Sequence, residues 1–72
     1  MIYVDNKIRL RVKVDGEKHA QTLFMNFDPE KITEAITDSN GCIVHIRYKT
    51  QWYAIDQTVQ LSELKEHCKN LI

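Results

Sequence analysis

The sequence predicts an α+β fold, in which two antiparallel β-hairpins form a sheet packed on two short helices in the order ββαββα. Three observations predict it. The stretch KIRLRVKV, residues 7–14, alternates cationic and apolar residues without a break, and a period of two is that of a strand. The pair Asp28-Pro29 is typical of a helix start. The C-terminal stretch SELKEHCKNLI repeats apolar residues at helical spacing.

Length and composition predict one small cytoplasmic domain over residues 1–72. A chain of 72 residues encloses only one core. With 43% hydrophobic and 28% charged residues it is ordinary for a globular protein, and it has no apolar run long enough to span a membrane. It opens on Met without an apolar leader and has only two cysteines. We therefore expect a complete, reduced protein with no secretory signal.

The first hairpin joins residues 7–14 to a return strand over about residues 19–27. Asp15-Gly16 lies between them, and this dipeptide is common in two-residue turns because both positions tolerate a positive φ. With such a turn, Ile8 lies opposite Leu23, and the apolar face of the return strand consists of Leu23, Met25 and Phe27. A three-residue turn would bury a less apolar set, so we prefer the two-residue turn. That rejected set is Ala20, Thr22 and Phe24.

The segment FDPEKITEAITDSNG predicts a short helix of about ten residues. Asp28 fits the N-cap, Pro29 the first helical position, and Glu30 the positive end of the helix dipole. Asn40-Gly41 accepts the left-handed conformation that often ends a helix. The buried face of this helix would hold Ile32, Ala35 and Ile36.

The segment CIVHIRYKTQWYAID predicts a second hairpin with its turn between Lys49 and Gln51. A loop of two or four residues places the aliphatic residues and the tyrosines on one face, namely Val44, Ile46, Tyr48, Tyr53 and Ile55. The other face then holds His45, Arg47, Trp52 and Asp56. We reject a three-residue loop because it would bury Asp56.

The last helix is predicted from Ser62, which we expect to cap it. Its apolar residues recur at spacings of three, four and three, which is the period of one helix face. We expect Cys68 to be a buried thiol on that face. The residues concerned are Leu61, Leu64, Cys68 and Leu71.

The residue types that carry metal or catalytic chemistry are poorly placed for either. Cys42 and His45 point to opposite faces of one strand, and His67 and Cys68 diverge by about 100° on a helix. His19 has no chelating neighbour in the sequence. We find no phosphate-binding glycine loop and no serine in a nucleophile elbow, and a chain this small leaves little volume for a substrate pocket. We therefore expect no enzymatic activity, no metal and no cofactor.

The cationic side of the first strand suggests one function. In a single sheet, its cations share the outer face with aromatic residues of other strands, and single-stranded nucleic acids are bound by such combinations. Zero net charge and the absence of an RNA-recognition aromatic pattern favour a merely solvated face, so nucleic-acid binding is the alternative function. The candidate residues are Lys7, Arg9, Arg11, Lys13, Phe24, Arg47 and Trp52, with His45 beside them.

The length of the first strand points to protein binding. An unbroken strand over residues 2–14 would run roughly 43 Å, whereas a domain of this size is only about 30 Å across. Either the chain bends or bulges at Asp5-Asn6, or its first residues project and pair with another chain. We therefore predict a protein-binding module, a regulator, inhibitor or accessory subunit, which forms a two-fold homodimer or binds a foreign protein. The candidate interface is Ile2, Tyr3 and Val4.

Overall fold

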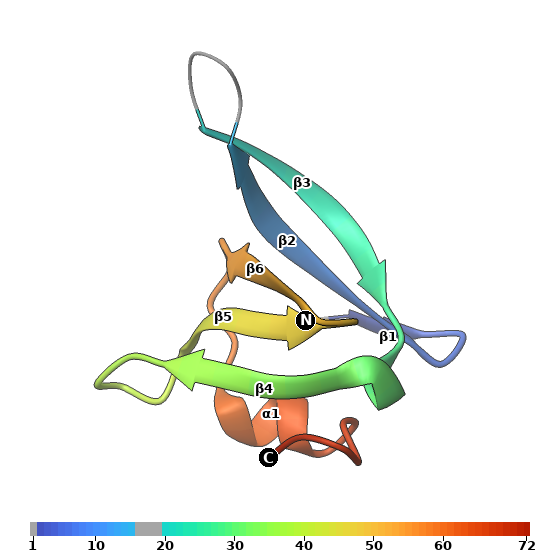
Figure 1. The fold of residues 1–72 in the computed structure, drawn as a ribbon. Coiled ribbons are helices and arrows are strands. Elements are labelled where there is room, and N and C mark those ends of the chain that lie inside the picture. The colour runs from blue at the N-terminus through green and yellow to red at the C-terminus, as the bar shows by residue number, and fades with distance from the viewer. Residues whose placement is uncertain (1, 16–19) are drawn as a thin grey trace.

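The computed structural model describes residues 2–15 and 20–72, and in these residues the protein is mostly β (Figure 1). The predicted α+β fold with two helices packed on a sheet is wrong. The described residues form six strands in one curled antiparallel sheet, accompanied by a short α-helix and a 3-10 turn. The elements are β1 (Ile2–Val4), β2 (Lys7–Asp15), β3 (Ala20–Phe27), η1 (Pro29–Lys31), β4 (Ile32–Thr37), β5 (Ile43–Tyr48), β6 (Gln51–Ile55) and α1 (Leu61–Lys65).

The strand β2 pairs with three other strands of the sheet. It pairs with β3 through residues 8–15, and it also pairs with β1 through residues 7–9 and with β6 through residues 12 and 13. Because a strand has only two edges, β1 and β6 share the edge opposite β3. The sheet continues from β6 to β5 and β4. In Figure 1 the hairpin of β2 and β3 extends away from the other strands.

The first hairpin has the predicted faces but a different register. Ile8 lies opposite Phe27 rather than Leu23, a shift of four residues along β3. An even shift leaves each side chain on its own face, so Phe27 is fully buried and Met25 half-buried, as predicted, while Leu23 remains 41% exposed. Asp15 belongs to β2, and Gly16 of the predicted turn lies outside the described residues.

The N-terminal segment folds back on β2 in its own chain. Asp5 and Asn6 have φ values of 55° and 61°, and they form a tight turn that joins β1 to β2. Asp and Asn enter this left-handed region more readily than most residues. The long strand is therefore interrupted at the predicted position, but by a reversal of the chain and not by a bulge or a projecting end.

The first predicted helix is wrong beyond its first turn. Asp28 does act as an N-cap, since its Oδ1 accepts a hydrogen bond from the Glu30 backbone N–H at 3.1 Å. The helical segment ends at Lys31, however, and β4 follows. Four of the six residues in β4, ITEAIT, are β-branched, a composition that favours strands. Consequently Ile36 is exposed rather than buried.

The second hairpin is confirmed with a two-residue loop, because Tyr48 pairs with Gln51. Lys49 and Thr50 form the turn with φ values of 48° and 67°. The predicted faces are also confirmed: Ile46, Tyr48 and Ile55 are buried, whereas His45 and Trp52 are exposed.

The closing helix is shorter than predicted and ends at Lys65. Gln60, not Ser62, takes the N-cap position and makes no side-chain capping bond. Leu64 and Cys68 are nevertheless buried in the core formed by the sheet, as the apolar spacing predicted. The fully buried side chains of that core are Ile8, Leu10, Val12, Phe27, Ile32, Ile46, Val59 and Leu64.

Candidate protein-interaction surface

The strand register places the predicted cationic residues on one outer face of the sheet. Side chains directly opposite each other on antiparallel strands point to the same side. Arg11 lies opposite Phe24, and Lys13 lies opposite Ala54 of β6. Two residues from Ala54, Trp52 lies opposite Arg47. The outer face therefore includes Lys7, Arg9, Arg11, Lys13, Phe24, Arg47 and Trp52, with His45 opposite Ala54.

Two residues of β1 belong to the same face, which the sequence did not reveal. Ile2 lies opposite Arg9, and Val4 lies opposite Lys7. Tyr3 points to the other side, where its ring stacks on His67 with centroids 4.1 Å apart. The predicted interface and the predicted cationic face thus adjoin because β1 folds back on β2.

We call the surface formed around this junction the outer patch, defined as Ile2, Val4, Lys7, Arg9, Phe24 and Asn26. Ile2, Val4 and Phe24 are 56%, 58% and 54% exposed. An open groove of about 300 Å³ is lined by all of these residues except Phe24, together with Asp5. The patch therefore presents large apolar side chains and two cations around one shallow depression.

Carboxylates lie close to several cations of the outer face. Lys7 Nζ is 3.9 Å from Asp28 Oδ2, and Arg47 Nη1 is 3.0 Å from Glu34 Oε1. The Nε of Arg11 lies 3.5 Å from Asp56 Oδ2 and donates to the Asp56 carbonyl oxygen at 2.7 Å. These contacts partly neutralise the face that a phosphate backbone would have to bind.

Among the described side chains, Arg9 contacts an aromatic ring instead of a carboxylate. Its guanidinium carbon lies 4.8 Å from the centroid of the Phe24 ring, and none of the ion pairs between described residues includes Arg9. Stacking on a ring holds a guanidinium in position and leaves its N–H groups at the edge, where they can donate two parallel hydrogen bonds to a carboxylate. Arg9 therefore presents an oriented guanidinium group beside apolar side chains.

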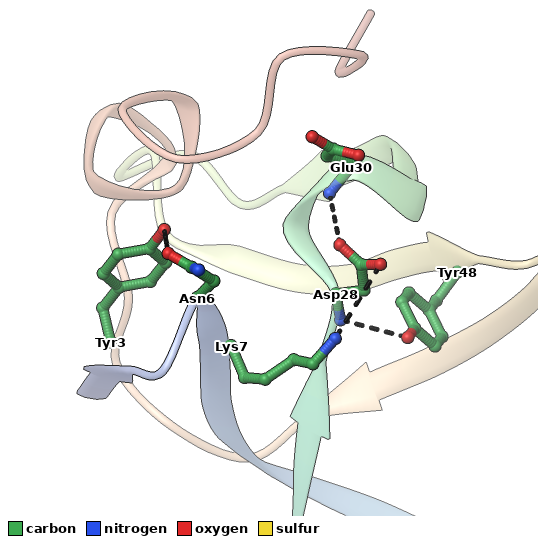
Figure 2. A network of polar contacts seen from close by, with 6 residues as sticks. All are labelled: Tyr3, Asn6, Lys7, Asp28, Glu30 and Tyr48. Atoms are coloured by element: carbon green, nitrogen blue, oxygen red, sulfur yellow. Dashed lines mark hydrogen bonds and ion pairs between the residues drawn. The ribbon is translucent and has the colours of Figure 1, made fainter.

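The polar residues near β1 and η1 mainly support the fold. Figure 2 shows Asp28 at their centre: its backbone N–H donates to the Tyr48 hydroxyl oxygen at 3.0 Å, while its carboxylate contacts Lys7 and the Glu30 N–H. Tyr3 donates to Asn6 Oδ1 at 3.4 Å. A second open groove, of about 420 Å³, lies beside these groups, but its acidic and basic side chains already contact one another in part.

Metal binding and thiol chemistry depend on where the structure places the histidines, cysteines and carboxylates. Within residues 2–15 and 20–72, no three His, Cys, Asp or Glu side chains are grouped to hold a metal. Both cysteines are free, and burial raises the pKa of Cys68 to about 11, so this thiol is unreactive at neutral pH. The sulfur of Cys42 accepts a hydrogen bond from Gln60 Nε2 at 3.2 Å. His19 lies outside the described residues.

Among the described residues, no helix has the length and apolar character needed to cross a membrane. No protein-family model, curated protein or solved structure matches the chain.

Proposed function

We propose that the protein is a small protein-binding module that acts in the cytoplasm as a regulator, inhibitor or accessory subunit. Its outer patch binds an extended segment of a partner protein that carries apolar side chains next to a carboxylate. The observation that carries the proposal is the juxtaposition of Ile2, Val4 and Phe24, each more than half exposed, with the ring-stacked Arg9.

Exposure of the apolar side chains of Ile2, Val4 and Phe24 to water is unfavourable when no partner covers them. Complete burial of one such side chain contributes about 1.5–3 kcal/mol. Covering the exposed half of three of them would contribute about 3 kcal/mol, which is about a hundredfold in affinity. Contiguous apolar patches on small proteins commonly mark interaction sites, and arginine and aromatic residues are enriched in them. A carboxylate on the partner would then be recognised by Arg9.

Partner proteins fit this face better than single-stranded nucleic acid does. A nucleic acid needs several cations that are available to phosphates, yet Lys7, Arg11 and Arg47 each have a carboxylate within 4 Å. Zero net charge also provides no long-range attraction for a polyanion. The outer patch itself offers more apolar than cationic side chains.

A displayed library of short peptides, selected against the wild-type protein, tests the proposal. We expect the selected peptides to combine apolar residues with Asp or Glu. Arg9→Glu and Val4→Asp should each weaken their binding by about tenfold or more, because each removes one of the two kinds of contact. The matched control is Ile36→Asp, since Ile36 is also an exposed isoleucine, 48% accessible, but lies on β4 away from the patch.

If the selected peptides bind the Arg9→Glu and Val4→Asp variants as tightly as the wild type, the outer patch is not their binding site. A parallel titration with a single-stranded oligonucleotide at low salt examines the alternative. Tight binding that falls with salt at a log-log slope of about three, and that Arg9→Glu abolishes, would show nucleic acid to be the ligand instead.

A further inference from the structure

The outer edge of β3 is the longest open edge in the described part of the sheet. One edge of β3 pairs with β2 over all of residues 20–27, and no other described strand pairs with the second edge. Figure 1 shows β3 on the outside of the hairpin that extends from the body of the protein. Alternate backbone N–H and C=O groups along such an edge point away from the sheet and can pair with another strand.

The other end of the sheet is protected, and β3 is not. The edge strand β4 contains two register irregularities, and the Ile72 backbone N–H donates to the Thr33 carbonyl oxygen at 3.0 Å. Natural edge strands are usually guarded by charges, prolines or bulges. The sequence of β3, AQTLFMNF, has no charged residue and no proline in a chain with 28% charged residues, and β3 pairs with β2 without a register shift.

We propose that this edge is the interface of a homodimer, in which the β3 strands of two copies pair in antiparallel orientation about a two-fold axis at Phe24. A strand without charges is complementary to itself, because no like charges meet when it pairs with its own copy. The inference goes beyond the proposed function, since it uses the backbone edge of β3 and a second copy of this chain.

The side chains of β3 favour an axis at Phe24 over an axis at Leu23. With the axis at Phe24, the two Phe24 rings lie side by side, Leu23 lies opposite Met25 of the second copy, and Thr22 lies opposite Asn26. With the axis at Leu23, Phe24 would lie opposite Thr22, and Met25 opposite Gln21. The first register pairs apolar with apolar residues, and cross-strand aromatic pairs contribute beyond their buried area.

The dimer also brings the two outer patches together. An axis perpendicular to the sheet keeps each side chain on its own face, so both Phe24 rings remain on the outer face. Because each Arg9 stacks on its own Phe24, the two guanidinium groups would flank the paired rings. The protein partner would then meet one continuous surface with two-fold symmetry.

Charge substitution at Phe24 tests the dimer by sedimentation equilibrium. We expect the wild type to associate as concentration rises and Phe24→Glu to associate about tenfold more weakly, because two carboxylates would then lie opposite each other. Phe24→Lys should behave in the same way. An equimolar mixture of the two variants should recover the dimer mass, since Lys and Glu would pair across the axis. Ile36→Asp, on β4, is the control and should dimerise like the wild type.

A wild type that is monomeric at every accessible concentration overturns the proposal. So does a dimer that neither Phe24 variant weakens, or a mixture that does not recover the dimer. Because Phe24 is 54% exposed, we expect both variants to fold, and their circular dichroism spectra check this. The proposed function has a separate test through Arg9 and Val4, so either proposal can fail alone.

Cross-linking gives a second measurement. Residues directly opposite each other on antiparallel strands have Cα atoms about 4.5–5.5 Å apart, within the range for a disulfide. In a Cys42→Ser background, with oxidised glutathione as the oxidant, Phe24→Cys should form a disulfide-linked dimer much faster than Ser39→Cys, a control at an exposed loop position. Equal rates for the two variants would contradict the proposed register.

Discussion

Replacing Thr50 by glycine should stabilise the protein, which is an unusual expectation for a substitution that removes a side chain. Thr50 has a φ of 67° in the turn between β5 and β6. The left-handed region costs an L-residue roughly 1–2 kcal/mol, and β-branched residues are among the least tolerant of it. Glycine adopts this conformation without that cost, so Thr50→Gly removes the strain in the folded state.

The expected gain is smaller than the strain because glycine also increases the entropy of the unfolded chain. That entropy costs roughly 0.5–1 kcal/mol. The difference between the two terms is a stabilisation of about 0.5–1 kcal/mol. Thr50 is exposed, and among the described residues its hydroxyl bonds only to the carbonyl oxygen of Lys49, so little else is lost. A glycine at the second turn position is also common in two-residue hairpin turns.

Urea denaturation followed by circular dichroism measures the gain. If the urea m-value is about 1 kcal/mol per molar, the midpoint of Thr50→Gly should rise by about 0.5–1 M. Asn6→Gly is the matched control, because Asn6 occupies the equivalent position of the turn between β1 and β2 with a φ of 61°. Asparagine tolerates this region, so we expect almost no gain there. A fall in the Thr50→Gly midpoint, or an equal rise for Asn6→Gly, would show that the positive φ of Thr50 does not strain the folded state.

Three further predictions concern the core. Leu64→Ala should lower the free energy of unfolding by about 2–5 kcal/mol, because Leu64 is fully buried; a loss below 1 kcal/mol in urea denaturation would place Leu64 outside the core. Burial raises the pKa of Cys68 from 9.0 to about 11, so as pH rises the thiol ionises in the unfolded chain before it ionises in the folded protein. The free energy of unfolding should therefore be unaffected by Cys68 below pH 9 and fall between about pH 9 and 11. Cys68→Val should lack that component of the decline, and under native conditions a thiol reagent should label Cys42 faster than Cys68. Tyr48→Phe should cost about 1–2 kcal/mol in thermal or urea unfolding, since the Asp28 N–H would lose its acceptor, and an unchanged midpoint would show that water replaces it.

Alternation of residues predicted the strands well because a period of two is a strong signal when one face is buried. It assigned the correct faces to β2, β3, β5 and β6. It could not assign the register of the first hairpin, since a shift of four residues leaves every side chain on the same face. The polarity of Asp56 settled the second hairpin, because a three-residue loop would have turned this carboxylate toward the core.

The helix predicted from Asp28 shows where local signals failed. Asp28 and Pro29 do start a helical turn, but these two residues determine only how a helix begins. The following ITEAIT is rich in β-branched residues, and β5 provides a neighbouring strand with which it pairs. Tertiary pairing therefore outweighed an amphipathic pattern at Ile32, Ala35 and Ile36. The four β-branched residues of ITEAIT favour a strand, and this signal could have corrected the prediction.

The candidate site was predictable in part. Alternation along β2 placed the cations on the outer face, and the excessive length of the first strand drew attention to Ile2 and Val4. The sequence could not show that β1 folds back beside Lys7 and Arg9, although Asp5-Asn6 between two apolar segments is a turn signal. The ion pairs and the open edge of β3 depend on strands distant in sequence, so only the structure reveals them.

Photo-cross-linking in the cells where the protein occurs tests protein binding by the outer patch most directly. A photoreactive phenylalanine analogue would replace Val4 in one variant and Ile36 in the control, and the products would be treated with nuclease before mass spectrometry. We expect one nuclease-resistant foreign protein to be attached at Val4, absent at Ile36, and lost when Arg9→Glu is added. A product that forms equally at both positions, that survives Arg9→Glu, or that nuclease removes would contradict it.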